Sequence, residues 1–179
     1  DGTSTAARLI EDTDSQSHYV HGGSSAVVST TSGTTYTWSV YVKAGDGATT
    51  PDVVQLAFRG ATHTSAYANY NISTSTVTQS SGLVSSSITS VGNGWYRLVA
   101  TVTANASGSG GGGVLAFNND NGTAGRLPLY AGSTSTDILF WGPQFEQRSS
   151  ATAYTATTSS PIVKYQPVLQ TAASGEARF

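Results

Sequence analysis

The fold of this chain is decided by the stretch Gly92-Asn93-Gly94-Trp95-Tyr96-Arg97-Leu98. Asn93 and Gly94 both tolerate positive φ, so the pair predicts a tight turn between two strands. The residues from Trp95 to Val102 alternate bulky with smaller or polar side chains, as a half-buried strand does. A second stretch, Phe140-Trp141-Gly142-Pro143-Gln144-Phe145-Glu146, again places a Trp beside glycine punctuation. Both stretches indicate the framework of a β-sandwich, and neither carries a recognisable reactive group.

The clearest strand is Thr35 to Lys43, which alternates with a period of two. One face carries Tyr36, Trp38, Val40 and Val42, and the other carries Thr35, Thr37, Ser39, Tyr41 and Lys43. We expect one face to meet a core and the other to meet solvent or a partner. Further strands are predicted at 8–10, 17–21, 26–29, 53–59, 66–72, 77–78, 86–91, 114–117 and 137–141. Short strands separated by Gly, Asn and Asp predict an all-β fold, a jelly-roll β-sandwich of two antiparallel sheets.

The ends and loops of the chain suggest how it is organised. Residues 107–113 are rich in Gly and Ser and predict a flexible loop. The tail contains Pro161 and Pro167 and ends in small residues. We therefore expect one sandwich domain over residues 1–158, and an extended arm or linker to a further region over residues 159–179.

Composition excludes several classes of function. Only 10% of the 179 residues are charged, against about 25% in an average soluble protein, so hydroxyls and amides must form the surface. The net charge of −2 provides no basic field for nucleic acid. No apolar run is long enough to predict a membrane span. Cys is absent, which excludes disulfides and thiolate metal sites.

The sequence gives little support for catalysis or for a metal. The acidic residues lie mostly in polar, turn-like segments, and no carboxylate pair or nucleophile–base pair stands out, so we do not expect an enzyme. His18 and His21 would point to opposite faces of a strand, which favours exposed or hydrogen-bonded histidines over a metal site. Structural calcium is the cofactor left open, with weak candidate ligands Glu11, Asp12, Asp14 and Asp120.

Carbohydrate binding is the remaining candidate activity, because aromatic rings stack on sugar C–H faces and amides bind hydroxyls. The candidate residues are Tyr41, Tyr67, Tyr70, Asn69, Asn71 and Tyr130. In contrast, Trp38, Trp95 and Trp141 lie on apolar strand faces, which favours a place in the core. Arg97 and Glu146 are predicted to form a framework ion pair.

Four motifs in order resemble a sandwich domain of bacteriophage structural proteins, described as head-spike fibre, tail-fibre or carbohydrate-binding-like modules. They are Asp1–Ala6, Tyr36–Gly45, Gly92–Arg97 and Trp141–Glu146, the last with Ala151–Tyr154 shortly after it, and the resemblance covers about residues 1–158. It implies a virion-surface or extracellular structural protein that forms a homo-oligomer, with a trimer expected by analogy. Other virion proteins are the implied partners, with glycans as a further class. The alternative is a carbohydrate-binding module of an adhesin or of a polysaccharide-degrading enzyme.

Overall fold

The computed structural model describes residues 5–21, 28–47, 51, 53–59, 63, 65–117 and 122–157. This part of the chain is almost entirely β, and its strands pair antiparallel throughout. The predicted all-β sandwich is therefore confirmed. No helix within these residues is long and apolar enough to cross a membrane. The predicted arm over residues 159–179 lies outside the described residues.

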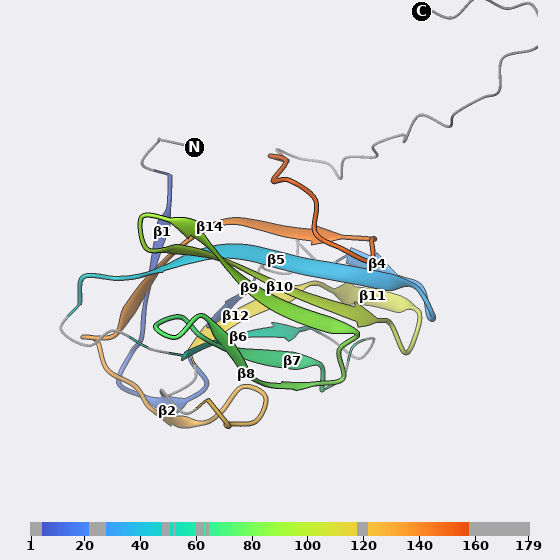
Figure 1. Ribbon diagram of the computed structural model, residues 1–179. Helices are drawn as coiled ribbons and strands as arrows, with labels where there is room; N and C mark the ends of the chain where they lie inside the picture. The colour runs from blue at the N-terminus through green and yellow to red at the C-terminus, as the bar shows by residue number, and fades with distance from the viewer. Residues whose placement is uncertain are drawn as a thin grey trace, which may run out of the picture.

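Two five-stranded sheets make up most of the molecule (Figure 1). The first sheet has the order β1 (Ala7–Ile10), β14 (Asp137–Glu146), β5 (Thr35–Ala44), β10 (Trp95–Thr103) and β9 (Ser85–Gly92). The second sheet has the order β3 (Tyr19–His21), β12 (Gly113–Phe117), β6 (Val53–Phe58), β7 (Tyr67–Asn71) and β8 (Thr76–Ser81). Two small ribbons complete the fold: β11 (Gly108–Gly111) with β4 (Val28–Thr30), and β13 (Tyr130–Ala131) with β2 (Ser15–Gln16).

The core lies between the two large sheets. The predicted inward face of β5 packs in one cluster with residues of β6, β7, β10 and β12, which explains why its alternation is so regular. Tyr70 of β7 crosses the core, and its hydroxyl donates a 2.7 Å hydrogen bond to the Val99 carbonyl of β10. The Trp38 ring lies directly against Gly113 of β12, where an added Cβ would come within 2.2 Å of the ring. Tyr70 of the second sheet and Trp38 of the first sheet therefore each contact the opposite sheet across the core.

The Asn93–Gly94 turn is confirmed. Trp95 pairs with Gly92, and the φ angles of Asn93 and Gly94 are 52° and 75°. Two central residues with positive φ are the mark of a type I′ hairpin turn. The register shifts between Trp95 and Tyr96, so the strand before the turn carries a bulge beside it.

Three predictions about elements need correction. The Gly-rich stretch predicted as a flexible loop contains β11, which pairs with β4, because glycine places no side chain in the way of a neighbouring strand. The strand predicted over residues 137–141 continues to Glu146 through a register shift between Trp141 and Gln144. The outward face of β5 does not meet solvent throughout, because Thr37 and Ser39 are fully buried.

Candidate functional site

An aromatic cluster lies on the outer face of the first sheet. Tyr41 and Trp141 are cross-strand neighbours on β5 and β14, and their ring centroids are 5.4 Å apart. Tyr154 packs on the other side of Trp141 at 4.4 Å. The guanidinium of Arg97, which is opposite Tyr41 on β10, lies 5.3 Å from the Tyr41 ring centre. These four half-buried residues, Tyr41, Arg97, Trp141 and Tyr154, are called the outer cluster.

A bulge in β14 directly follows Trp141. Trp141 pairs with Tyr41, and Gln144 pairs with Ser39, so β14 contains one more residue than β5 over this interval. The extra residue keeps both Trp141 and Gln144 on the outer face and turns Phe145 towards the core. Gly142 occupies the bulge with φ 60°, and a Cβ there would lie 3.1 Å from the Tyr154 ring. Glycine is required here both for its backbone conformation and for the approach of the rings.

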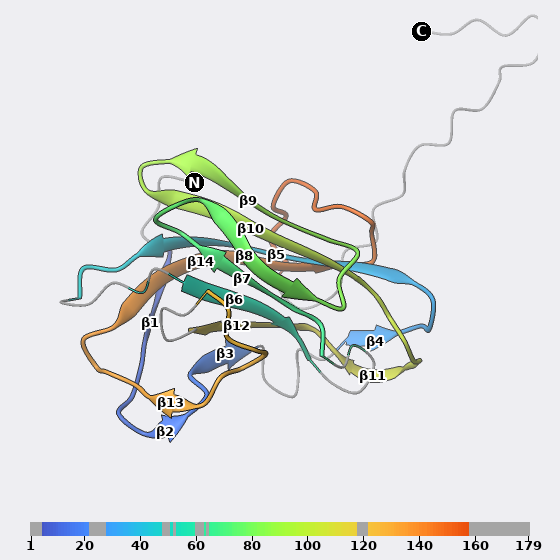
Figure 2. The same cartoon turned by 60° about the horizontal axis from the view of Figure 1, so that its bottom comes forward.

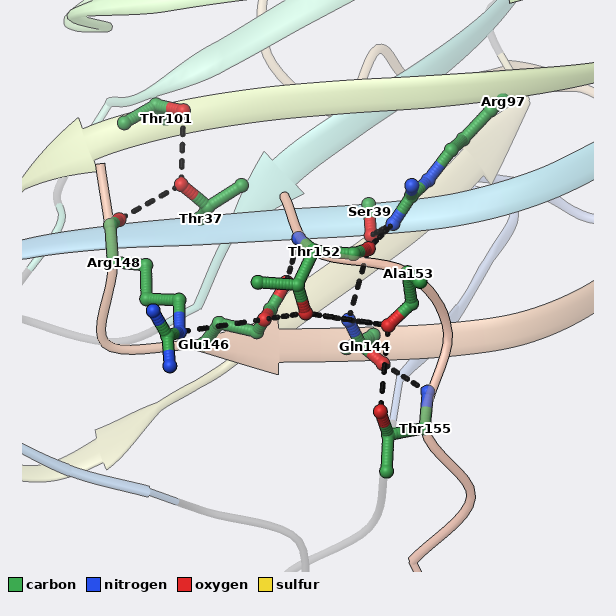
Figure 3. Close-up of polar contacts among 10 residues, drawn as sticks. All are labelled: Thr37, Ser39, Arg97, Thr101, Gln144, Glu146, Arg148, Thr152, Ala153 and Thr155. Atoms are coloured by element: carbon green, nitrogen blue, oxygen red, sulfur yellow. Dashed lines mark hydrogen bonds and ion pairs between the residues drawn. The ribbon is translucent and has the colours of Figure 1, made fainter. Parts of the chain in front are cut away.

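The segment of residues 147–157, called the strap, covers the part of this face next to the outer cluster, over β5 and the end of β14 (Figure 3). Glu146 accepts hydrogen bonds from the Thr152 hydroxyl at 2.6 Å and from its backbone N–H at 3.1 Å. The Thr155 N–H donates to Gln144 Oε1 at 2.8 Å, and Thr37 donates to the Arg148 carbonyl at 2.9 Å. Outward side chains of β5 and β14 thus fasten the strap to the sheet. This contact explains the burial of Thr37 and Ser39.

Arg97 fastens the strap from the third strand, β10. Its Nη2 donates to Ser39 Oγ at 3.1 Å and to the Thr152 carbonyl. The predicted ion pair between Arg97 and Glu146 is replaced by an indirect link, because both side chains bind different atoms of Thr152. The reason is that Thr152 of the strap lies between the side chains of Arg97 and Glu146. Strand periodicity cannot predict such a covering segment.

The charge on Glu146 is stabilised by this arrangement. Burial alone would raise the pKa of the Glu146 carboxyl, but hydrogen bonds from Thr152 and Gln144 and the nearby Arg148 outweigh burial and lower it. Both carboxylate oxygens already accept hydrogen bonds from Thr152. The carboxylate of Glu146 therefore serves to hold the strap in place.

Three of the predicted sugar-contacting residues are buried. Tyr67 is 7% exposed, and Asn69 and Tyr70 are 0% exposed, so these side chains cannot stack on or bond to an external sugar. Asn69 instead donates to the carbonyls of Gly122 and Ala124 and accepts from Gln55. Asn69 and Tyr67 are buried because a loop over residues 122–127 lies on the outer face of the second sheet. Tyr70 is buried because it points into the core between the sheets.

The other predicted sugar-contacting residues lie apart from one another. Asn71 accepts hydrogen bonds from Ser73 and Thr74 and shapes the turn after β7. Tyr130 donates its hydroxyl proton to Glu11. Of the six candidates, Tyr41 alone belongs to the outer cluster. The structure therefore does not bring the predicted set together in one site.

Two of the weak calcium candidates, Glu11 and Asp12, already accept hydrogen bonds from neighbouring groups. Glu11 is buried and accepts from the Tyr130 hydroxyl and from the Ser133 N–H at 3.0 Å. Asp12 accepts from the Asp14 N–H at 3.1 Å and from Gln16 at 2.9 Å, and its Oδ1 lies 3.3 Å from Nδ1 of His18. Within the described ranges, no group of three or more His, Asp or Glu residues is arranged to hold a metal ion. Asp120 lies outside these ranges.

The two histidines are not placed as a strand would place them. His18 precedes β3, is buried, and has Nε2 3.2 Å from the Tyr130 carbonyl. His21 lies within β3, and its ring stacks on Tyr19. Both histidines therefore have neighbours of their own, as expected of hydrogen-bonded or packed side chains.

Sequence reasoning missed most of the outer cluster. Trp95 and Trp141 were expected in the core, but both are half-buried, and Trp38 is the buried tryptophan of the three at 7% exposure. One signal was available, since Tyr41 shares its strand face with Thr37, Ser39 and Lys43. Phe145 packs on the core, and a period of two carried back from Phe145 through the bulge at Gly142 would assign Trp141 to the core face as well, which is wrong.

Residues from all four sequence motifs meet at this surface. Thr5 comes from the first motif and accepts a 2.9 Å hydrogen bond from Trp141 Nε1. Tyr41, Arg97 and Trp141 come from the other three motifs, and Thr152 and Tyr154 come from the stretch that follows the fourth. No protein-family model matches the chain, and no curated protein is significantly similar to it. The fold and this surface define the class of protein, an all-β sandwich with a strapped outer face.

Proposed function

We propose that this chain is a non-enzymatic structural module of a bacteriophage virion, such as a head fibre, capsid decoration or tail-fibre domain. We propose further that its outer cluster contacts glycans. The observation that carries the proposal is the convergence of residues from all four phage-like motifs on one outer surface. If the motifs resembled the phage family only by chance, their residues would not be expected to contact one another in the folded chain. The low charge of the chain also suits the dense packing of copies in a virion.

The strand order supports the jelly-roll interpretation. The chain passes from β1 in the first sheet to β3 in the second, then back to β5 and on to β6 and β7 in the second. The strands β10, β12 and β14 repeat the alternation in the second half. The last strand, β14, lies between β1 and β5. This alternation is that of two interlocked Greek keys, with β8 and β9 added at one side.

The chemistry of the outer cluster suits a glycan. Tyr41, Trp141 and Tyr154 present half-exposed ring surfaces against which sugar C–H groups can pack. Lys43 and Trp95 form the next cross-strand pair along the same face, which extends the surface with a cation and a further ring. Because the outer cluster is held by the strap and by Thr5, its rings are preorganised for binding.

A glycan array, followed by calorimetry on the best ligand, tests glycan binding. Tyr41→Ala and Tyr154→Ala each remove one ring of the outer cluster, and we expect each to weaken binding at least tenfold, about 1.4 kcal/mol. Tyr19→Ala is the matched control, because Tyr19 is a 45% exposed ring on the second sheet. Absence of glycan binding, or equal loss in the Tyr19 variant, would refute glycan recognition by the outer cluster.

The virion role needs a separate measurement. Immunogold electron microscopy with antibodies against this domain should label intact particles at their heads or tails. Label confined to material free of particles would instead favour the alternative, a carbohydrate-binding module of an adhesin or of a polysaccharide-degrading enzyme. In that case the glycan measurements would still identify the binding surface.

A further inference from the structure

At one side of the sandwich, each of the two sheets ends in a strand whose outer edge is paired with no other strand of the described residues. β9 is the last strand of the first sheet, and β10 is its hydrogen-bonded neighbour. β8 is the last strand of the second sheet and lies beside β9. Figure 2 shows β9 at the margin of the molecule. Each edge strand presents one row of backbone N–H and C=O groups that no described strand pairs.

The opposite edge of the first sheet is protected in the usual way. β1 is four residues long and carries Arg8, which lies 2.7 Å from Asp46 and 2.7 Å from Asp137. Short length and charged side chains both discourage another strand from adding to an edge. β9 is eight residues long and contains neither charge nor Pro. The sequence has no Asp, Glu, Lys or Arg between Arg59 and Arg97, so β8 is uncharged as well.

The side chains of β9 are those of a pairing strand. Ser85, Ser87 and Thr89 are exposed on its outer face. At its two ends, Val84 is 64% exposed and Val91 is 50% exposed. In an antiparallel pair of identical strands, the beginning of one strand lies beside the end of the other. In such a pair, the hydroxyl-bearing residues of the two outer faces would lie opposite one another, with an exposed valine near each end of each strand.

We propose that β9 is a self-association edge, which pairs antiparallel with β9 of a second copy about a two-fold axis perpendicular to the sheet. A second copy fits because a neutral edge meets its equal without like-charge repulsion. The first sheet would then run continuously through ten strands, and the adjoining β8 strands would come to lie beside each other. Such a contact is isologous and closes at two copies. It therefore differs from the trimer implied by the phage resemblance, and it is independent of glycan binding.

Light scattering after size-exclusion chromatography tests this proposal on the full chain. We expect a mass of twice 18.4 kDa at high micromolar concentration. Ser87→Lys combined with Thr89→Lys places like charges opposite one another in the pair, and should weaken dimerisation at least tenfold while the circular dichroism spectrum stays unchanged. Thr103→Lys is the matched control, because Thr103 is an exposed strand residue on β10, and it should remain dimeric.

Hydrogen exchange on the unmodified chain decides the matter even if the lysine variant does not fold. The amides of β9 should exchange more slowly at high than at low protein concentration, while those of β1 should not change. A monomer at all concentrations, a trimer, or a dimer without added protection of β9 would each overturn the proposal.

Discussion

Tyr70 connects the two sheets through a single hydroxyl. The side chain is fully buried, and burial raises the pKa of its phenol well above the ordinary value. The hydroxyl therefore acts as a neutral donor, and it bonds to the Val99 carbonyl of the facing sheet. In the sequence, Tyr70 was a candidate for sugar contact. Its burial shows that the role of a strand residue depends on whether its face of the sheet meets solvent or the other sheet.

We expect Tyr70→Phe to lower the free energy of unfolding by about 1–3 kcal/mol, because the Val99 carbonyl loses a buried partner. Urea denaturation followed by fluorescence measures the change. Val77→Ala, which truncates a partly buried residue at the margin of the core, gives a comparison for simple loss of packing. If Tyr70→Phe has no measurable effect, water reaches the Val99 carbonyl and the inter-sheet bond contributes little.

Trp38 and Trp141 should differ in their contribution to stability. Trp38 is in the core, and Trp38→Ala should cost about 3–5 kcal/mol, as large aromatic truncations in cores do. Trp141 is half-buried in the outer cluster, and Trp141→Ala should cost less, about 1–2 kcal/mol. Thermal denaturation compares the two variants. Equal losses would mean that the outer cluster is as much a part of the framework as the core.

At the scale of elements, the β9–β10 hairpin depends on its turn. Gly94 has φ 75°, a conformation that a β-branched residue adopts only at a cost. We therefore expect Gly94→Val to destabilise the protein by more than Asn93→Gly, which keeps a residue tolerant of positive φ. Chemical denaturation of both variants provides the comparison. Equal tolerance of the two substitutions would contradict the type I′ turn.

The bulge in β14 shows how one element controls two surfaces. It turns Phe145 towards the core and keeps Gln144 and Glu146 on the outer face, where they hold the strap. A regular strand would place these residues on the opposite faces. The bulge at Gly142 therefore allows β14 to pack Phe145 in the core while Trp141 stays in the outer cluster.

At the scale of the whole molecule, two buried groups predict how stability depends on pH. Burial among the rings of Tyr36, Phe58 and Phe145 lowers the pKa of His63, against a smaller opposing effect of its backbone hydrogen bond with Arg59. The hydrogen bonds described above likewise lower the pKa of Glu146 below 4.5. In both cases the unfolded chain binds the proton more tightly than the folded one, so acid favours unfolding.

The contribution of His63 should be fully present above about pH 6.5 and decline as the pH falls towards its folded-state pKa. That of Glu146 should be present above about pH 4.5 and be lost as the pH falls through its own lowered pKa. Denaturation midpoints measured across this range should show both declines. His63→Gln should flatten the upper one and Glu146→Gln the lower one. A stability that stays constant down to pH 4 in the unmodified chain would contradict the role of His63.

The sequence by itself determined the all-β class, most of the strands, the Asn93–Gly94 turn and the inward face of β5. These features follow from local rules, because turns need particular φ angles and strands alternate their side chains with a period of two. Such local rules require no knowledge of distant residues. Prediction from strand alternation is most accurate where one face of a strand is apolar and the other polar, as in β5.

Only the tertiary structure decided what covers the outer faces. β6 is buried on both faces, and Asn69 is buried although it is polar, because a loop from far along the chain lies over the second sheet. The strap buries Thr37 and Ser39 in the same way, and the bulge at Gly142 places Gln144 and Glu146 on the face that the strap covers. Periodicity tells which residues share a face, but the partner of that face is set by contacts between segments more than a hundred residues apart, as between Thr37 and Arg148.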